Sequence, residues 1–135
     1  MIIIAAAVIL PFIAVTGSAS ASVTPNTTPA TCKTTTTPWA CVQVFGNGTD
    51  IVQMNGWAHN TTGAQLDYLH IELYDTYGVV IKNCGQFNLA AGANSPNCSW
   101  APNAGEPAAN YCAAVWQWLG GKNYADLGWE CVLVS

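Results

Sequence analysis

Charged side chains are the scarcest component of this sequence. Asp, Glu, Lys and Arg make up 7% of its 135 residues, whereas they make up roughly 25% of an average soluble domain. The basic residues are three lysines without any arginine, and the formal net charge is −4. Proteins that bind nucleic acids or anionic membranes use clustered basic side chains to neutralise phosphates. The composition therefore argues against both kinds of partner and predicts a surface of Thr, Asn, Ser and Gly.

Metal-binding and catalytic signatures are missing as well. No two cysteines stand in a C-x-x-C arrangement, and neither His59 nor His70 is at ligand spacing from a cysteine, which argues against zinc. The sequence contains no G-x-S-x-G element and no Gly-rich phosphate loop. His70 and Glu72 could form a base and its orienting partner on one strand face, but no nucleophile accompanies them. We therefore expect no metal, no cofactor and no enzymatic activity.

The chain begins with an apolar run that is short for a membrane span. Residues 1–15 carry no charge, and Ala19-Ser20-Ala21 follows with the small-x-small form that signal peptidase accepts. A membrane-spanning helix needs about 20 apolar residues. The absence of Lys and Arg before the run is unusual for a signal, and an uncleaved anchor is the alternative. We predict a signal peptide over 1–21, a secreted mature chain from Ser22 and no membrane attachment after cleavage.

The next segment, 22–38, reads SVTPNTTPATCKTTTTP and is dominated by Thr and Pro. It contains little that could pack in a core, and both residue types favour extended conformations. Tracts of this composition are typical of spacers outside the cell. We therefore predict a Thr/Pro-rich linker over 22–38, followed by one globular domain over 39–135.

Six cysteines follow the predicted cleavage site. An even count in a short exported chain indicates a disulfide framework, although the connectivity does not follow from the count. Only the last pairing has a structural argument, because a closing hairpin would bring its two cysteines face to face. We predict three bridges: Cys32–Cys41, Cys84–Cys98 and Cys112–Cys131.

From Trp39 onward, short alternating runs separated by turn signals predict β-strands. The clearest run is 66–75, where Leu69, Ile71 and Leu73 fall on one face. The segment 90–107 is rich in Asn, Pro, Gly and Ala, and we predict a long loop there that Cys98 ties down. About seven short strands without a long helical period predict an all-β fold, an immunoglobulin-like antiparallel β-sandwich stapled by disulfides.

One stretch also resembles a known family. The run NGWAHNTTGAQLDYLHIELYDTYGVVI, 55–81, is similar to the second and third strands of small extracellular immunoglobulin-like modules of the FxLYD type. More loosely, the predicted last hairpin, YCAAVWQW with LGWECVLV, is similar to the hairpins that close small cysteine-containing proteins secreted by actinobacteria. The resemblance implies an extracellular, non-enzymatic module whose ligand is undetermined. The residues that match the FxLYD pattern are Gly56, Ala58, Asn60, Leu73, Tyr74, Asp75 and Gly78.

The last predicted hairpin joins 111–119 to 127–134 and contains two tryptophans, Trp116 and Trp118, on one strand face. If Cys112 faces Cys131, the tryptophans lie on an apolar face and the polar side chains lie on the other. We therefore expect both tryptophans to point into the core, with a ligand-holding role as the alternative. The expected register is Ala113 with Glu130, Ala114 with Trp129, Val115 with Gly128, Trp116 with Leu127, Gln117 with Asp126 and Trp118 with Ala125.

The solvent side of the third strand and the final hairpin is the predicted binding face. Rings interleaved with hydrogen-bonding groups suit a neutral polysaccharide, because sugar faces stack on rings while polar groups bond the hydroxyls. We predict a secreted binding or adhesion module for a neutral extracellular or cell-surface polymer, with an extracellular protein as the other partner class. The predicted ligand-binding residues are Tyr68, His70, Glu72, Tyr74 and Gln117, with Asp126 and Glu130 beyond them.

Two other functions fit the same features. Small disulfide-rich exported proteins often present one rigid loop to a hydrolase, and 90–107 around Cys98 would be that loop in a protein inhibitor. Alternatively, the chain is a structural surface component carried by its Thr/Pro segment. Binding assays on insoluble polysaccharides beside protease and amylase assays would separate the three functions.

Overall fold

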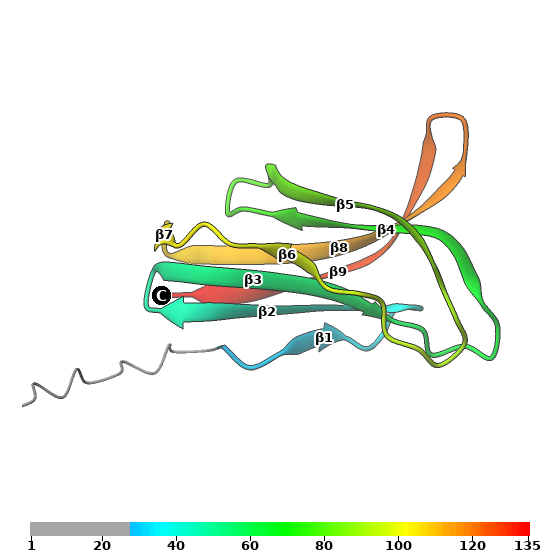
Figure 1. Cartoon of the computed structure of the whole chain (residues 1–135), viewed down its shortest axis with the longest axis horizontal. Coiled ribbons are helices and arrows are strands. Elements are labelled where there is room, and N and C mark those ends of the chain that lie inside the picture. The colour runs from blue at the N-terminus through cyan, green and yellow to red at the C-terminus, as the bar shows by residue number, and fades with distance from the viewer. Residues whose placement is uncertain (1–27) are drawn as a thin grey trace, which may run out of the picture.

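The computed structural model describes residues 28–135, so the predicted signal peptide 1–21 lies outside the described residues. These residues form two antiparallel sheets packed face to face (Figure 1). The first sheet contains, in spatial order, β1 (Thr31–Lys33), β2 (Trp39–Asn47), β3 (Asp50–His59) and β6 (Cys98–Trp100), and β7 (Ala104–Gly105) pairs with β3. The second sheet contains, in spatial order, β5 (Val80–Leu89), β4 (Leu66–Tyr74), β8 (Ala109–Gly120) and β9 (Asn123–Val134).

The antiparallel β-sandwich stapled by disulfides is confirmed, but its strand count differs from the expected seven. Three of the described strands, β1, β6 and β7, are only two or three residues long. Runs this short show no alternation that a sequence pattern could reveal. Two of them, β6 and β7, lie within 90–107, so the predicted long loop contains two strands that pair with β3.

Two features of this sandwich also occur in immunoglobulin domains. The spatial order β5-β4-β8-β9 is the order in which those domains arrange their C′, C, F and G strands. At the start of β8, the hydroxyl of Tyr111 donates a hydrogen bond of 3.0 Å to the carbonyl oxygen of Pro107. This is the geometry of the tyrosine corner found at the start of strand F.

The strand β1 lies inside the segment predicted as a linker. It pairs with β2 at the edge of the first sheet, and the disulfide Cys32–Cys41 joins the two strands. Further upstream, the hydroxyl of Thr28 accepts a hydrogen bond from the backbone N–H of Val44. The described part of the segment, 28–38, is therefore attached to the sandwich, so the structured region begins before Trp39.

All three predicted disulfides are confirmed. Cys32–Cys41 and Cys112–Cys131 each connect two neighbouring strands of one sheet, at directly opposed positions. Cys84–Cys98 instead connects β5 of the second sheet to β6 of the first. The covalent framework therefore ties each sheet internally and ties the two sheets to each other.

The core lies between the two sheets and is narrow. Leu69, Ile71 and Leu73 of β4 are buried there, as the alternation predicted. Across from them, Gly56 of β3 approaches so closely that an added Cβ would lie 2.6 Å from a methyl carbon of Leu73 and 2.8 Å from the Cβ of Ala113. Only glycine therefore permits this spacing of the sheets at Gly56.

The strands β8 and β9 have 12 residues each, and the tip of their hairpin projects beyond the other strands (Figure 1). The predicted register holds from Cys112–Cys131 to Val115–Gly128. Between Val115 and Trp116 the ladder shifts by one residue, so Leu127 has no partner and Trp116 pairs with Asp126. The predicted pairs beyond this β-bulge are therefore wrong by one position.

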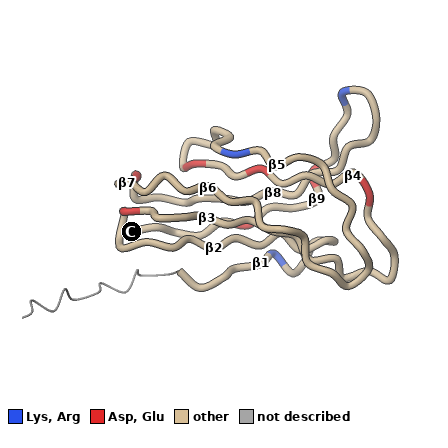
Figure 2. Tube along the Cα trace, in the orientation of Figure 1, with Lys and Arg blue, Asp and Glu red and all other residues tan. Residues whose placement is uncertain are grey.

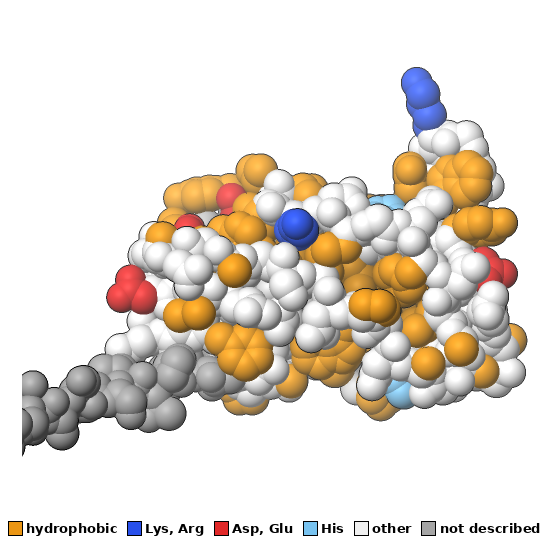
Figure 3. Space-filling model, viewed as in Figure 1, with side chains coloured by type: hydrophobic (Ala, Val, Ile, Leu, Met, Phe, Trp, Pro, Cys, Tyr) orange, Lys and Arg blue, Asp and Glu red, His pale blue; other side chains and the backbone are white. Residues whose placement is uncertain are grey.

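Charged side chains are sparse along the described chain (Figure 2). The face turned to the viewer in Figure 3 consists mainly of hydrophobic and uncharged polar side chains. Within residues 28–135, no helix has the length and apolar character needed to cross a bilayer.

Candidate functional site

The outward side of the β5-β4-β8-β9 sheet carries the tryptophans that were expected in the core. Trp116 pairs with His70 and Asp126, on the side of the sheet that faces away from the core. The prediction that Trp116 and Trp118 point inward is therefore wrong. β8 is apolar on both faces, so polarity does not orient it. Where Gly56 of β3 approaches β8, only a small side chain fits, and Ala113 occupies that position. The β8 residues that face the core are Tyr111, Ala113 and Val115.

Six aromatic side chains therefore share this outward side, which we call the aromatic face. Tyr68 packs edge-on against Trp118 with 5.6 Å between ring centroids, and His70 packs edge-on against Tyr124 at 5.2 Å. Three of the rings are more than half exposed: 52% for Tyr68, 51% for Tyr124 and 58% for Trp129. The rings of the aromatic face are those of Tyr68, Tyr74, Trp116, Trp118, Tyr124 and Trp129.

Most of the predicted ligand-binding residues lie on the aromatic face, but two do not. Gln117 pairs with the core residue Leu69, and its amide nitrogen donates a hydrogen bond of 3.1 Å to the carbonyl oxygen of Asp67. Glu130 pairs with Ala113, which faces the core. Directly opposed residues share a face, so Gln117 and Glu130 are on the inner side. Both misplacements come from assigning the wrong face of β8 to solvent.

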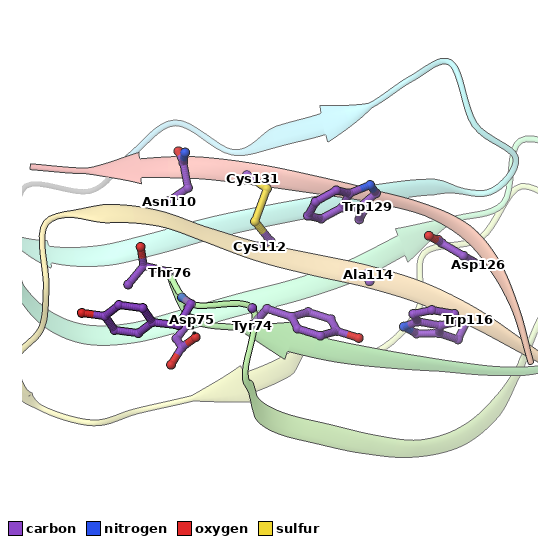
Figure 4. Close-up of a pocket in the computed structure, with 12 residues that line it drawn as sticks. Tyr74, Asp75, Thr76, Asn110, Cys112, Ala114, Trp116, Asp126, Trp129 and Cys131 are labelled. Carbon is purple, nitrogen blue, oxygen red and sulfur yellow. Dashed lines mark hydrogen bonds between the residues drawn. A yellow bond between two sulfur atoms is a disulfide. The ribbon is translucent and has the colours of Figure 1, made fainter.

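A groove with a volume of about 610 Å³ runs along the aromatic face (Figure 4). Ala114 and the disulfide Cys112–Cys131 form its floor, and Tyr74 and Trp129 rise on either side of them. Trp116 stands at one end, beside Asp126 of β9. The remaining lining residues are Asp75, Thr76, Tyr77, Gly78 and Asn110.

A second hollow of about 390 Å³ lies on the other side of Trp116 and is lined by His70, Glu72, Asn83, Trp116 and Tyr124. The imidazole Nε2 of His70 is 3.5 Å from the Glu72 carboxylate. The same carboxylate accepts a hydrogen bond of 2.9 Å from the Asn83 amide. His70 is only 7% exposed because it lies beneath this cluster, so Glu72, Asn83 and Tyr124 present more of the accessible surface.

Tyr74 is held in a fixed orientation between the two hollows. Its hydroxyl donates a hydrogen bond to Glu72. Burial, with the hydrogen bond to Glu72 and the negative charge of that carboxylate, raises the pKa of Tyr74 to about 12, while Trp116 acts in the opposite direction. The phenol therefore stays protonated at ordinary pH and keeps its ring against the groove.

The indole N–H of Trp116 is enclosed and donates no hydrogen bond within the described residues. Figure 4 shows the indole nitrogen directed toward the hydroxyl end of Tyr74. A buried N–H without an acceptor is costly.

Sequence reasoning missed Trp116, Trp118, Tyr124 and Trp129 as members of a surface site. One signal was available, because the hairpin has large aromatic residues on one face and mostly small ones on the other. Two facing sheets lie about 10 Å apart, which favours the face with the smaller side chains for the interior. The signal that could have located the bulge is Gly128, which adopts a positive φ of 142°.

The 90–107 segment, the alternative site, is anchored along much of its length. The hydroxyl of Ser95 accepts a hydrogen bond of 2.9 Å from the backbone N–H of Ala58, and Asn94 contacts His59 at 2.7 Å. Cys98 is bonded to Cys84. The segment is therefore held as a rigid surface element, and exposed residues occur along its whole length.

No group of three or more His, Cys, Asp and Glu side chains within residues 28–135 is arranged to hold a metal ion. No family model matches this chain, and neither a curated protein nor a solved structure matches it. The FxLYD relationship therefore stays a prediction, and the geometry of the aromatic face carries the functional argument.

Proposed function

We propose that this protein is a secreted, non-enzymatic binding module whose aromatic face takes up an extracellular or cell-surface polysaccharide. The observation that carries the proposal is the groove between Tyr74 and Trp129, with the second hollow beside it across Trp116, which lines both. Sugar rings have apolar faces that stack on aromatic side chains and hydroxyls that need polar partners. The aromatic face offers aromatic rings and polar groups in alternation along its strands.

The polar groups of the aromatic face fit a binding role. Glu72, Asn83 and Asp126 present carboxylate and amide groups at the rims of the two hollows. His70 and Asn83 both contact the Glu72 carboxylate, so they fix the position in which it can accept hydrogen bonds from the hydroxyl groups of a bound chain. The strands are linked by the Cys112–Cys131 disulfide directly beneath the groove, which holds the rings in place before a ligand arrives. A preorganised site loses less side-chain entropy on binding.

Several features support an extracellular location. Three disulfides in a chain of this size are typical of proteins that fold in an oxidising compartment. The apolar segment 1–15 and Ala19-Ser20-Ala21 have the composition of an export signal.

The test is retention of the purified, disulfide-bonded chain on chitin, cellulose and peptidoglycan. We expect the wild type to be retained on at least one of them, and Trp129→Ala or the double change of Tyr68 and Tyr74 to Ala to weaken that retention. Trp57→Ala is the matched control, because Trp57 lies on the outward side of the other sheet, opposite Cys41. Circular dichroism checks that each variant is folded.

Failure of the wild type to bind any of the three polymers would overturn the proposal. Equal retention of wild type and Trp129→Ala, with loss in Trp57→Ala, would move the site to the other sheet. If the wild type binds none of the three polymers, inhibition assays against proteases and amylases would test the 90–107 surface in its place.

A further inference from the structure

We infer that the groove is selective for a sugar that carries an ammonium group, the amine of a deacetylated amino sugar. This inference rests on the proposed function, since it names the sugar class that the aromatic face takes up. It comes from the charges around the groove and from the position of one carboxylate between two indoles.

At neutral pH the charged side chains that line the two hollows are all acidic, and His70 of the second hollow is the one titratable base in the two linings. Asp75 and Asp126 line the groove, and Glu72 lines the second hollow. The chain has only three basic residues, Lys33, Lys82 and Lys122, and none of them lines either hollow. A ligand in this groove therefore meets negative charge that no lysine of the lining neutralises. Such a field attracts a cation and raises its local concentration.

Asp126 is the carboxylate best placed to meet that cation. Its Oδ1 accepts a hydrogen bond of 2.9 Å from the backbone N–H of Gly128, whereas Oδ2 accepts none from the part of the chain that the structure describes. Asp75 is more occupied, because its Oδ1 accepts hydrogen bonds from both Tyr77 and Val79. Asp126 therefore has a carboxylate oxygen free to accept a charge-assisted hydrogen bond.

The surroundings of Asp126 add a second attraction for the same group. Trp116 lies directly opposite it on β8, and Trp129 is three residues further along β9 (Figure 4). The faces of indole rings attract cations, most strongly among the aromatic side chains. An ammonium group at the Asp126 end of the groove would thus contact a carboxylate and two indoles.

The dimensions of the groove fit a sugar ring rather than a bare cation. Its walls, Tyr74 on β4 and Trp129 on β9, stand on strands separated by β8 and therefore lie about 10 Å apart. From Cys112 to Trp116 the floor extends about 13 Å along β8. This space accommodates a ring between aromatic walls with its amine directed to Asp126, so ring stacking and ammonium binding act together.

The test is calorimetric titration of the disulfide-bonded chain with three soluble probes, under mildly acidic conditions that keep amines protonated. The probes are a glucosamine hexamer, the N-acetylglucosamine hexamer and hexalysine. We expect the glucosamine hexamer to bind at least about tenfold more tightly than the acetylated one, as one charge-assisted contact with an aromatic partner implies. Hexalysine has as many side-chain amines but no sugar rings, and we expect it to bind more weakly than the glucosamine hexamer.

Asp126→Asn should remove most of the preference for the glucosamine hexamer while keeping the acceptor for the Gly128 N–H. Asp50→Asn changes the net charge equally, but Asp50 begins β3 in the other sheet and should leave the preference intact. Equal affinity for the two sugar hexamers, equally tight binding of hexalysine, or an equal loss in both variants would overturn this inference. If neither sugar hexamer binds, this inference fails, whereas the proposed function is decided separately by retention on chitin, cellulose and peptidoglycan.

Discussion

Trp116 of β8 lies directly opposite Asp126 of β9. This pair is shifted by one residue from the register that runs from the open end of the hairpin to Val115. The shift leaves Leu127 without a partner, so a carboxylate rather than an aliphatic side chain faces the indole. β-Bulges commonly redirect side chains next to functional sites. Here the bulge combines an aromatic surface with a carboxylate that no lysine of the groove neutralises, and the proposed sugar selectivity depends on this pair.

The disulfide beneath the groove is expected to stabilise the fold strongly. Replacing Cys112 and Cys131 together by Ala releases a loop with a sequence separation of 19 residues, and the chain-entropy account assigns such a bridge about 3 kcal/mol. Thermal unfolding followed by circular dichroism should show a Tm lowered by more than about 10 °C. A decrease below about 3 °C would contradict this role.

Gly56→Ala is expected to destabilise the sandwich through overpacking. The new Cβ would lie 2.6 Å from Leu73 and 2.8 Å from Ala113, and overpacking of this kind costs about 1–3 kcal/mol. Urea unfolding measures the difference in the free energy of unfolding. Gly63→Ala is the matched control, because an added Cβ there meets nothing within 4 Å. Equal stability of the two variants would show that the sheets are further apart than described.

The raised pKa of Tyr74 predicts that the free energy of unfolding decreases at alkaline pH. Its pKa is about 12 in the folded protein and about 10 in the unfolded chain. Below pH of about 10 both states hold the proton; above it the unfolded state loses the proton first, so the free energy of unfolding falls as pH rises toward 12. Burial raises the pKa of Tyr111 as well, so it contributes in the same direction.

The measurement is urea unfolding of wild type and Tyr74→Phe at about pH 9 and about pH 11.5. The variant should lose less stability than the wild type between these two conditions, with a residual loss that Tyr111 contributes. An identical loss in both proteins would show that the pKa of Tyr74 is not raised in the folded protein.

The sequence predicted the fold better than it predicted the candidate site, and the hairpin explains why. The two-residue period of β4 identified its buried face correctly, because polar and apolar residues alternate there. In β8 both faces are apolar over 112–116, so hydrophobicity contains no information about direction, and only the difference in side-chain size between the two faces does. The choice depends on how closely Gly56 lets β3 approach β8, which is a long-range contact that no local pattern encodes.

The Cys112–Cys131 disulfide was predictable from the regular part of the same hairpin. Cys112 and Cys131 stand at opposed positions of a hairpin whose register is regular from its open end to Val115. The bulge comes after them, so it leaves the disulfide prediction intact while shifting Trp116, Gln117 and Trp118 by one partner each. A one-residue shift depends on the backbone of Gly128, and it decides which polar group reaches the groove.

The most direct test of the aromatic face as the binding surface uses the six tryptophans of the chain as internal reporters. Three lie on the aromatic face, namely Trp116, Trp118 and Trp129, and three lie elsewhere, namely Trp39, Trp57 and Trp100. In a protein labelled with ¹⁵N at the indoles, NMR spectra recorded during titration with the glucosamine hexamer should show shifts of Trp116, Trp118 and Trp129 while the other three indole signals stay in place. Shifts confined to Trp39 and Trp57, or no shift at saturating sugar, would contradict the account.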